Sequence, residues 1–285
     1  MIIEFLGTGG AAATPIPGAT DPTSIKARTI GAPYSRYGPC IYVHGPELMI
    51  DTPEEARLAM ERAGLARVPH CVYSHWHPDH TFGRRIFEFN RDFGRFPGQN
   101  YCTQVYLPDT VANSNDNLGL QNSLHWYARW GWVKVHTLKN DAAFELNGVQ
   151  IKPIVVTPDL ACGFLLTEGH KRALIVPDEV HGWQPPACVR GVDVAVMPAG
   201  IMPTNLFSGA ARWDLAHPVF RFEPTFDDVL GMIAQIQPKR VFITHLEAND
   251  MPDYDQLRTV AARLTASGKY GELTFAWDTL SVEVD

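Results

Sequence analysis

Residues 74–80 read Ser74-His75-Trp76-His77-Pro78-Asp79-His80, directly after an apolar, strand-like run. Three of the chain's eleven histidines and one aspartate fall within six positions, a grouping that chance does not readily produce. His75 and His77 project the same way if the strand continues, and Pro78 then forces a turn. That turn brings Asp79 and His80 round to a position separate from that of His75 and His77. Because imidazole and carboxylate groups are ligands of zinc, iron and manganese, the run predicts a metal site at the end of a strand.

Outward from this run, the apolar pattern alternates between short strand-like segments and a few helices. Strands are predicted at Ile2–Leu6, Cys40–Val43, Leu48–Asp51, Cys71–Ser74, Gln104–Leu107, Val133–Thr137, Val149–Val156, Gly163–Thr167, Ala173–Val176, Val192–Met197, Arg240–Thr244, Leu273–Trp277 and Leu280–Val284. Many short strands with few helices indicate two packed sheets with helices outside, a layered α/β fold. No repeat or linker interrupts the pattern, so a single domain over residues 1–285 is predicted.

Three helices are indicated by their capping residues. Thr52-Pro53-Glu54-Glu55 offers an N-cap, a proline at the first helical position and two acids, for a helix that runs to Arg62. Similar signals begin helices at Thr225 and Asp253. Three segments are predicted to be long loops, which are common at binding sites: Ala11–Gly38, Asn113–Trp132 and Gly200–Pro224.

The composition argues against several classes of protein. The chain is 45% hydrophobic and 19% charged, with a net charge of −7. That balance suits a large core and argues against a nucleic-acid partner, which usually binds a basic surface. The sequence lacks an apolar stretch of membrane-spanning length, and its N-terminus lacks the features of a signal peptide. No membrane partner and a cytoplasmic location are therefore expected.

The His-x-His-x-Asp-His run of residues 75–80 resembles the signature of the metallo-β-lactamase superfamily. The strand-to-helix step at Leu48–Thr52 is similar to that family's, and Phe5–Ala11 resembles the branch of the tRNA 3′-processing endonuclease and the phosphoribosyl cyclic phosphodiesterase. Weaker likeness lies at 163–166, 176–178 and 241–246. The resemblance implies a four-layer αββα sandwich with two divalent metal ions, zinc being expected and manganese or iron the alternatives.

The resemblance also implies a set of ligands. His75 and His77 would hold one metal; Asp79, His80 and His245 would hold the other. Asp178 would bridge the two. The residues agree, because Asp178 and His245 each follow an apolar strand run, where the ligands of layered sheets converge. The alternatives are that Asp178 is a turn residue and that His245 is a surface group. Asp51 is expected to accept the other N–H of a ligand histidine.

Two positions depart from the family pattern. The family usually supplies another histidine just before the strand at Gly163, but here Thr157 stands near that position, with Asp159 two residues on. We predict Asp159 as a carboxylate substitute; otherwise the first metal is weak or absent, or His181 approaches it. The branch also places a histidine before the penultimate helix, where this chain has Glu223. Glu223 is interpreted as a catalytic proton donor or, equally, as a helix-flanking acid.

These features predict a metal-dependent hydrolase that cleaves a phosphodiester of a small, cyclic or nucleotide-like molecule with a metal-bound hydroxide. Asp79 would orient the nucleophile. The turn at 7–10 offers backbone amides to an anion or simply makes a tight turn, and Arg212 or Arg221 would contact phosphate. One alternative is a lactonase or ester hydrolase, with the aromatic residues at 126–132 lining an apolar pocket. Another is a catalytically impaired, metal-binding ligand sensor. A small-molecule substrate and a homodimer are the expected partners.

Overall fold

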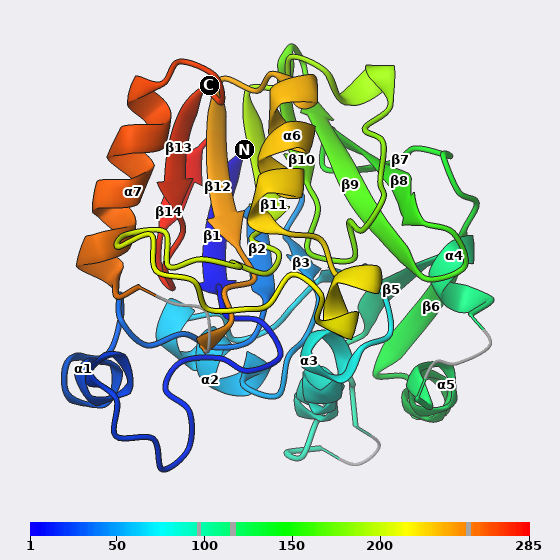
Figure 1. Cartoon of the computed structure of the whole chain (residues 1–285). Helices are drawn as coiled ribbons and strands as arrows, with labels where there is room; N and C mark the ends of the chain where they lie inside the picture. Colours follow the sequence, from blue (N-terminus) through cyan, green and yellow to red (C-terminus); the bar gives the residue numbers. More distant parts are fainter. Residues whose placement is uncertain (96–97, 115–117, 249–251) are drawn as a thin grey trace.

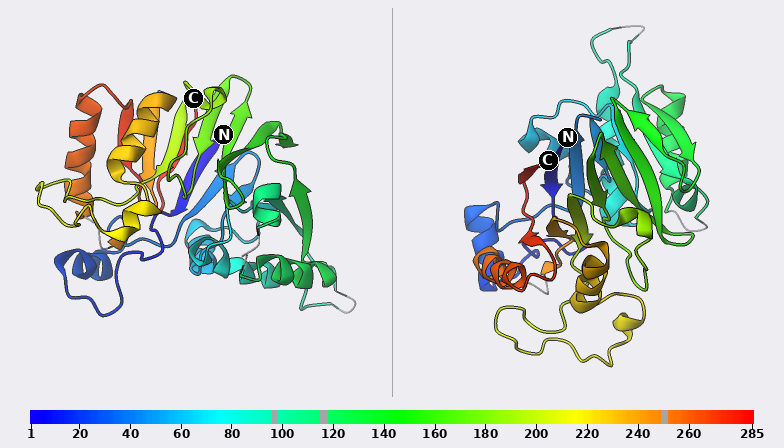
Figure 2. Two further views of the ribbon diagram at one scale, coloured as in Figure 1. Left: turned by 45° about the vertical axis from the view of Figure 1, so that its right-hand side comes forward. Right: turned by 90° about the horizontal axis from the view of Figure 1, so that it is seen from above.

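The computed structural model describes residues 1–95, 98–114, 118–248 and 252–285. Two seven-stranded sheets pack face to face, with helices over their outer faces (Figure 1). Figure 2 shows the same layers from two other sides. The predicted four-layer αββα arrangement is therefore confirmed.

The strands follow a simple order in each sheet. The first sheet runs β14 (Ser281–Glu283), β1 (Ile2–Gly7), β2 (Cys40–His44), β3 (Leu48–Ile50), β4 (His70–Val72), β5 (Thr103–Pro108) and β6 (Val133–Leu138). The second runs β13 (Glu272–Phe275), β12 (Arg240–Thr244), β11 (Val194–Pro198), β10 (Lys171–Ile175), β9 (Ala161–Glu168), β8 (Val149–Thr157) and β7 (Phe144–Leu146). Thirteen of these strands overlap the predicted ones, and the three-residue β7 was not predicted.

Each sheet contains one parallel block, which decides where polar side chains gather. β3 to β6 are parallel in the first sheet, with Ile50 beside Val72. β10 to β13 are parallel in the second, with Leu174 beside Ala195. In open sheets, ligands bind outside the carboxyl ends of parallel strands. The loops that leave β3, β4, β10 and β12 are therefore the expected place for a site.

Three apolar clusters separate the four layers. The cluster between the sheets includes Phe5 and Val43 from the first sheet and Phe164 and Ile175 from the second, all fully buried. A second cluster fills the space between the first sheet and its helices, and a third does the same for the second sheet. Strands buried on both faces appear in the sequence as continuous apolar runs, which is why most were predictable.

The helices lie at the outer faces and at the loop edge. They are α1 (Pro22–Ile30), α2 (Ala56–Ala63), α3 (Pro78–Thr81), α4 (Asp109–Ala112), α5 (Leu120–Arg129), α6 (Phe226–Ile236) and α7 (Tyr254–Ala266), with 3-10 turns η1 (Phe82–Asn90), η2 (Ala187–Val189) and η3 (Pro218–Arg221). Capping boxes begin α6 and α7, as their sequences predict. Among the described residues, no helix is long and apolar enough to cross a membrane.

Three expectations about helices were wrong. α2 begins at Ala56 rather than after Thr52, because the Thr52 hydroxyl hydrogen-bonds Tyr73 Oη (2.9 Å) instead of capping. α1 lies in the segment predicted as the loop 11–38, with Asp21 as its side-chain cap. α5 lies in the predicted loop 113–132, of which residues 115–117 fall outside the described part. Its buried side chains recur at helical spacing within an aromatic stretch, which hid the pattern.

Candidate metal centre

Two groups of potential ligands meet where loops leave both sheets. The first group contains His75, His77, Asp178 and Glu179; the second contains Asp79, His80 and His245. Within each group, the ligand atoms all lie within 4.8 Å of one another. The segments that follow β4, β10 and β12 supply all seven residues, with Asp79 and His80 in the short helix α3. Figure 1 shows this edge at α3, at the end of the sheets opposite the two chain termini.

The two groups touch each other through Asp178. Its Oδ2 lies 3.3 Å from His245 Nε2, although Asp178 also belongs to the first group. The rings of His75 and His80 are 4.1 Å apart between centroids. Asp79 Oδ2 lies 3.3 Å from His245 Nε2 and 3.4 Å from His80 Nε2. Asp178 thus occupies the position between the groups that a bridging carboxylate needs.

Two ring nitrogens show that this arrangement suits a metal. His75 and His80 are fully buried, and among the described residues the Nε2 atom of each has no hydrogen-bond partner. A buried polar atom without a partner is costly and needs an explanation. The neutral imidazole nitrogen is the commonest metal ligand, and the acids beside it complete mixed nitrogen and oxygen sets. The residues present therefore fit two divalent ions.

Asp51 fixes the orientation of both buried rings, as its position at the end of β3 predicts. Its carboxylate accepts hydrogen bonds from Ser74 N (2.7 Å) and Ser74 Oγ (2.6 Å), and it accepts from His80 Nδ1 (2.8 Å). Because the Ser74 hydroxyl donates to Asp51, it accepts from His75 Nδ1 at 2.9 Å. Both rings therefore use Nδ1 for these contacts, which leaves Nε2 as the nitrogen available to a metal, and burial keeps His75 neutral by lowering its pKa.

The pKa values of all three residues in the second group are strongly shifted. Burial disfavours ionisation of Asp79, but His80 and His245 outweigh it and hold the pKa of Asp79 far below its usual range. Burial lowers the pKa of His245, but Asp178 and Asp79 outweigh it and raise the pKa to about 9. The pKa of His80 is likewise raised, because Asp79 and Asp51 overcome its burial. Without a metal, these imidazoles keep protons that a cation must displace.

Metal uptake should therefore release protons. We expect Zn²⁺ added to the metal-free protein at pH 7.5 to release about two protons from the second group, and its affinity to rise with pH up to about pH 9, the pKa of His245. A pH-stat titration measures this directly, and His245→Asn should release about one proton fewer. Metal binding without proton release would contradict the arrangement.

The structure brings together most of the residues predicted as ligands, but not Asp159. The six that meet are His75, His77, Asp79, His80, Asp178 and His245. Asp159 lies exposed in the turn between β8 and β9, with φ at 59°, and belongs to neither group of the described residues. The tight turn points its side chain to solvent. His181 is also exposed and outside both groups.

Glu179 is the member of the site that the sequence did not suggest. Its Oε1 lies 3.1 Å from His77 Nδ1. The signal was present, because two adjacent acids follow the strand at β10, but a chain in extended form would turn the second one away. The backbone of Glu179 is left-handed, with φ at 62°, so the alternating directions of an extended chain do not apply to its side chain.

Glu223 lies within electrostatic range of both groups. Burial first, and then Asp178 and Glu179, raise the pKa of Glu223 to about 7, while His245 and His77 oppose the shift. A carboxylic acid with that pKa holds its proton in part of the molecules near neutral pH. Its raised pKa, and the electrostatic influence of Asp178 and Glu179 on it, therefore suit a proton donor near the candidate metal centre.

The glycine turn after β1 supports the site instead of binding an anion. Thr8 N donates to Asp278 Oδ1, Gly9 N to Tyr37 O, and Gly10 N to Leu246 O. These amides already have partners, which favours the alternative of a tight turn over that of an anion site. Any Cβ at Gly10 would lie 2.8 Å from His245 Nδ1, so only glycine lets the turn pack against that ring.

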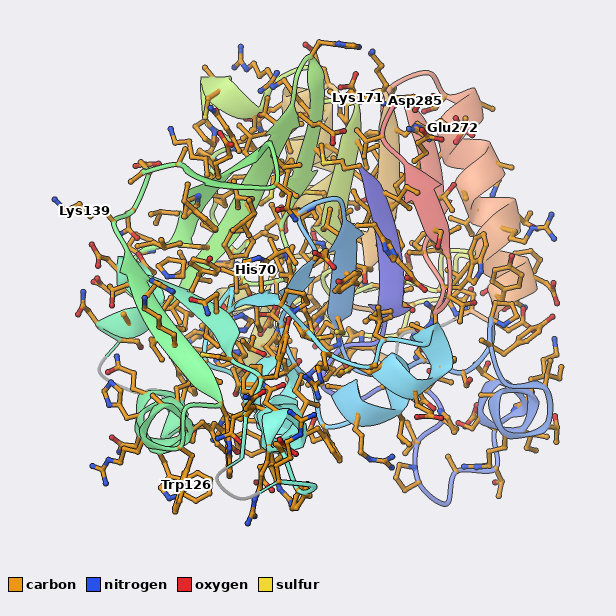
Figure 3. All side chains as sticks on the ribbon, turned by 180° about the vertical axis from the view of Figure 1, so that it is seen from behind. His70, Trp126, Lys139, Lys171, Glu272 and Asp285 are labelled. Carbon is orange, nitrogen blue, oxygen red and sulfur yellow. The ribbon has the colours of Figure 1, made fainter. Side chains whose placement is uncertain are left out.

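The tryptophan cluster near α5 is separate from the candidate metal centre. Trp126, Trp130 and Trp132 contact one another and line a cavity of about 670 Å³. None of the described residues that line it is a candidate ligand. In Figure 3, Trp126 lies at the end of the molecule opposite Asp285, which is also the end of the candidate ligands, so the separation rests on the residues that line the cavity. The cluster therefore gives no support to an apolar pocket at the metals.

The chain belongs to the beta-lactamase superfamily. The family model described as "Beta-lactamase superfamily domain" matches residues 45–246, a range that contains all seven candidate ligands, from His75 to His245. Comparison with curated proteins gives no match.

Solved structures of the metallo-β-lactamase fold are similar over the whole chain. A diphosphatase from the PhnP family is 20% identical, with a TM-score of 0.67, covering 100% of this chain and 98% of that chain. Zn²⁺-bound PqqB from Methylobacterium extorquens is 14% identical, with a TM-score of 0.69 and 100% coverage of both chains. Human tRNase Z, short form, is 15% identical, with a TM-score of 0.61 and 100% coverage of both. At these identities the likeness shows the fold.

Proposed function

We propose that this chain is a dinuclear metal-dependent hydrolase that cleaves a phosphodiester in a small, cyclic or nucleotide-like molecule. The observation that carries the proposal is the pair of ligand groups joined at Asp178, with unpartnered Nε2 atoms on the buried rings of His75 and His80. Zinc is the expected ion, with manganese or iron as alternatives, because all three accept mixed imidazole and carboxylate ligands.

Each group of residues has a task in this reaction. Two divalent cations supply positive charge at the reacting oxygens and lower the pKa of water. Asp51 and Ser74 hold the rings of His75 and His80 in place. Asp79, ionised at neutral pH, orients the attacking water, and Glu223 donates a proton to the leaving oxygen.

The choice of a phosphodiester over a carboxylic ester rests on two supports. The similar structures include a diphosphatase and a tRNase Z, whose names describe cleavage at phosphorus. The lactonase alternative relied on an apolar pocket at residues 126–132, and the cavity there is lined by none of the candidate ligands among the described residues. A small-molecule substrate, a homodimer and a cytoplasmic location remain part of this proposal.

A substrate panel tests the proposal. Protein loaded in turn with Zn²⁺, Mn²⁺ and Fe²⁺ is given bis(p-nitrophenyl) phosphate, cyclic nucleotides and acyl-homoserine lactones. We expect turnover of phosphodiesters at least about tenfold above that of lactones, lost on chelation and regained when metal is added back. His77→Ala should be inactive. Faster lactone turnover would favour the lactonase alternative, and ligand binding without turnover at full metal loading would favour a sensor.

A further inference from the structure

The position where the family usually has a histidine ligand is used differently in this chain. Thr157 stands there, and its hydroxyl donates a hydrogen bond to the backbone carbonyl oxygen of Glu179 at 2.6 Å. Asp159, the nearest acid in the sequence, is exposed in the following turn. The end of β8 therefore supplies no imidazole or carboxylate to the site, but it holds the backbone that carries Glu179.

Glu179 reaches the site only because its backbone is unusual. A residue other than glycine with φ at 62° is uncommon and strained. Such conformations persist where surrounding contacts hold them, and they gather at functional sites. Here the Thr157 hydroxyl supplies one such contact. The result is a carboxylate whose Oε1 lies 3.1 Å from His77 Nδ1 and within 4.8 Å of the ligand atoms of His75 and Asp178.

We propose that Glu179 is a direct ligand of the first metal and replaces the missing imidazole. This inference rests on the proposed dinuclear centre. An independent observation points to a cation at the same place: the Nε2 atom of His75, in the same group, is fully buried and has no partner among the described residues. The first metal then has two imidazoles and two carboxylates, a set richer in oxygen than three imidazoles and suited to Mn²⁺ or Fe²⁺ as well as Zn²⁺.

A competing role for Glu179 is to orient His77 by accepting a hydrogen bond from its Nδ1 without touching the metal. The variant Glu179→Gln separates the two roles. The glutamine carbonyl oxygen still accepts the hydrogen bond from His77, but it lacks the charge of a carboxylate ligand. If Glu179 only orients the ring, Glu179→Gln should bind both metals almost as well as the original chain.

The experiment measures metal binding, not activity. The metal-free chain, Glu179→Gln and the control Asp159→Asn are titrated with Zn²⁺ and with Co²⁺, whose absorption spectrum reports its ligands, and metal per chain is measured after dialysis. We expect two metals per chain in the original and in Asp159→Asn. In Glu179→Gln we expect one retained metal, an affinity for the other at least about tenfold weaker, and an altered Co²⁺ spectrum. Circular dichroism of the metal-free proteins checks that all three fold alike.

The outcomes separate this inference from the proposed function. Two tightly bound metals in Glu179→Gln, with an unchanged Co²⁺ spectrum, would overturn the assignment and leave the dinuclear hydrolase in place. No metal in the original chain, even after reconstitution, would remove the proposed function itself. Loss of one metal in Asp159→Asn, with both retained in Glu179→Gln, would return the ligand role to Asp159.

Discussion

Asp51→Ala should abolish binding at both sites of the proposed dinuclear centre and remove a large part of the protein's stability. The Asp51 side chain is only 1% exposed and accepts three hydrogen bonds, two from Ser74 and one from His80. Removing it leaves buried donors unpaired, which we expect to lower the free energy of unfolding by about 3–5 kcal/mol. Both ligand rings then lose their orientation, because His75 depends on the same carboxylate through Ser74.

Metal per chain and thermal unfolding of the metal-free protein measure the two effects separately. The matched control is Asp193→Ala. Asp193 is also buried and accepts from Arg172 N at 2.7 Å, but it precedes β11, at the end of that strand away from the site. We expect the control to lose stability and to keep two metals. Equal metal loss in both variants would mean that the effect of Asp51 is only on folding.

Glu223→Gln should lower kcat by about 100-fold or more for substrates with a poor leaving group. The proton that Glu223 donates is present below its pKa of about 7, so activity that depends on it falls as pH rises through that value. Cations beside Asp178 and Glu179 cancel part of the charge that raises this pKa. The alkaline fall in rate is therefore expected at or below pH 7, and it should disappear in the variant.

Leaving-group dependence shows whether Glu223 donates a proton. The leaving group of a p-nitrophenyl phosphodiester is p-nitrophenolate, which departs without being protonated. Turnover of this substrate by Glu223→Gln should therefore change much less than turnover of an alkyl phosphodiester. The control is Asp227→Asn, an exposed acid four residues on, which should leave both rates unchanged. An equal fall for both kinds of substrate would make Glu223 a helix-flanking acid with a structural effect.

The sequence predicts the fold well because its signals are local. Strands such as β11 and β12 are buried on both faces and appear as unbroken apolar runs. The caps of α6 and α7 lie within four residues of the helices they begin. Prediction fails where tertiary contacts compete with local signals. The sequence predicts Thr52 as a helix cap, but its hydroxyl forms a hydrogen bond with Tyr73, which follows β4. Helix α5 was not predicted, because the aromatic residues in and after it were interpreted as the lining of a pocket.

The same distinction applies to the site. His75, His77 and His80 are recognisable because they are neighbours in the chain, and Asp178 and His245 because parallel strands deliver their ends to one edge. The sequence predicts Asp159 as a ligand, but the structure places Glu179 in the ligand group instead, for a reason that the sequence does not show. Both have left-handed backbones, with φ at 59° and 62°, but only the Glu179 carboxylate lies among the ligand atoms, while the Thr157 hydroxyl bonds the carbonyl oxygen of that residue.

The ligands come from both sheets, and this bears on how the protein assembles. His75 and His80 follow a strand of the first sheet, while Asp178 and His245 follow strands of the second, with at least 98 residues (178 − 80) between the two pairs. Neither complete ligand group exists until the sheets dock, so an unfolded chain offers a cation only the short histidine run. In the proposed dinuclear hydrolase, tight metal binding is then a late step of folding, and each bound ion links the two halves of the sandwich.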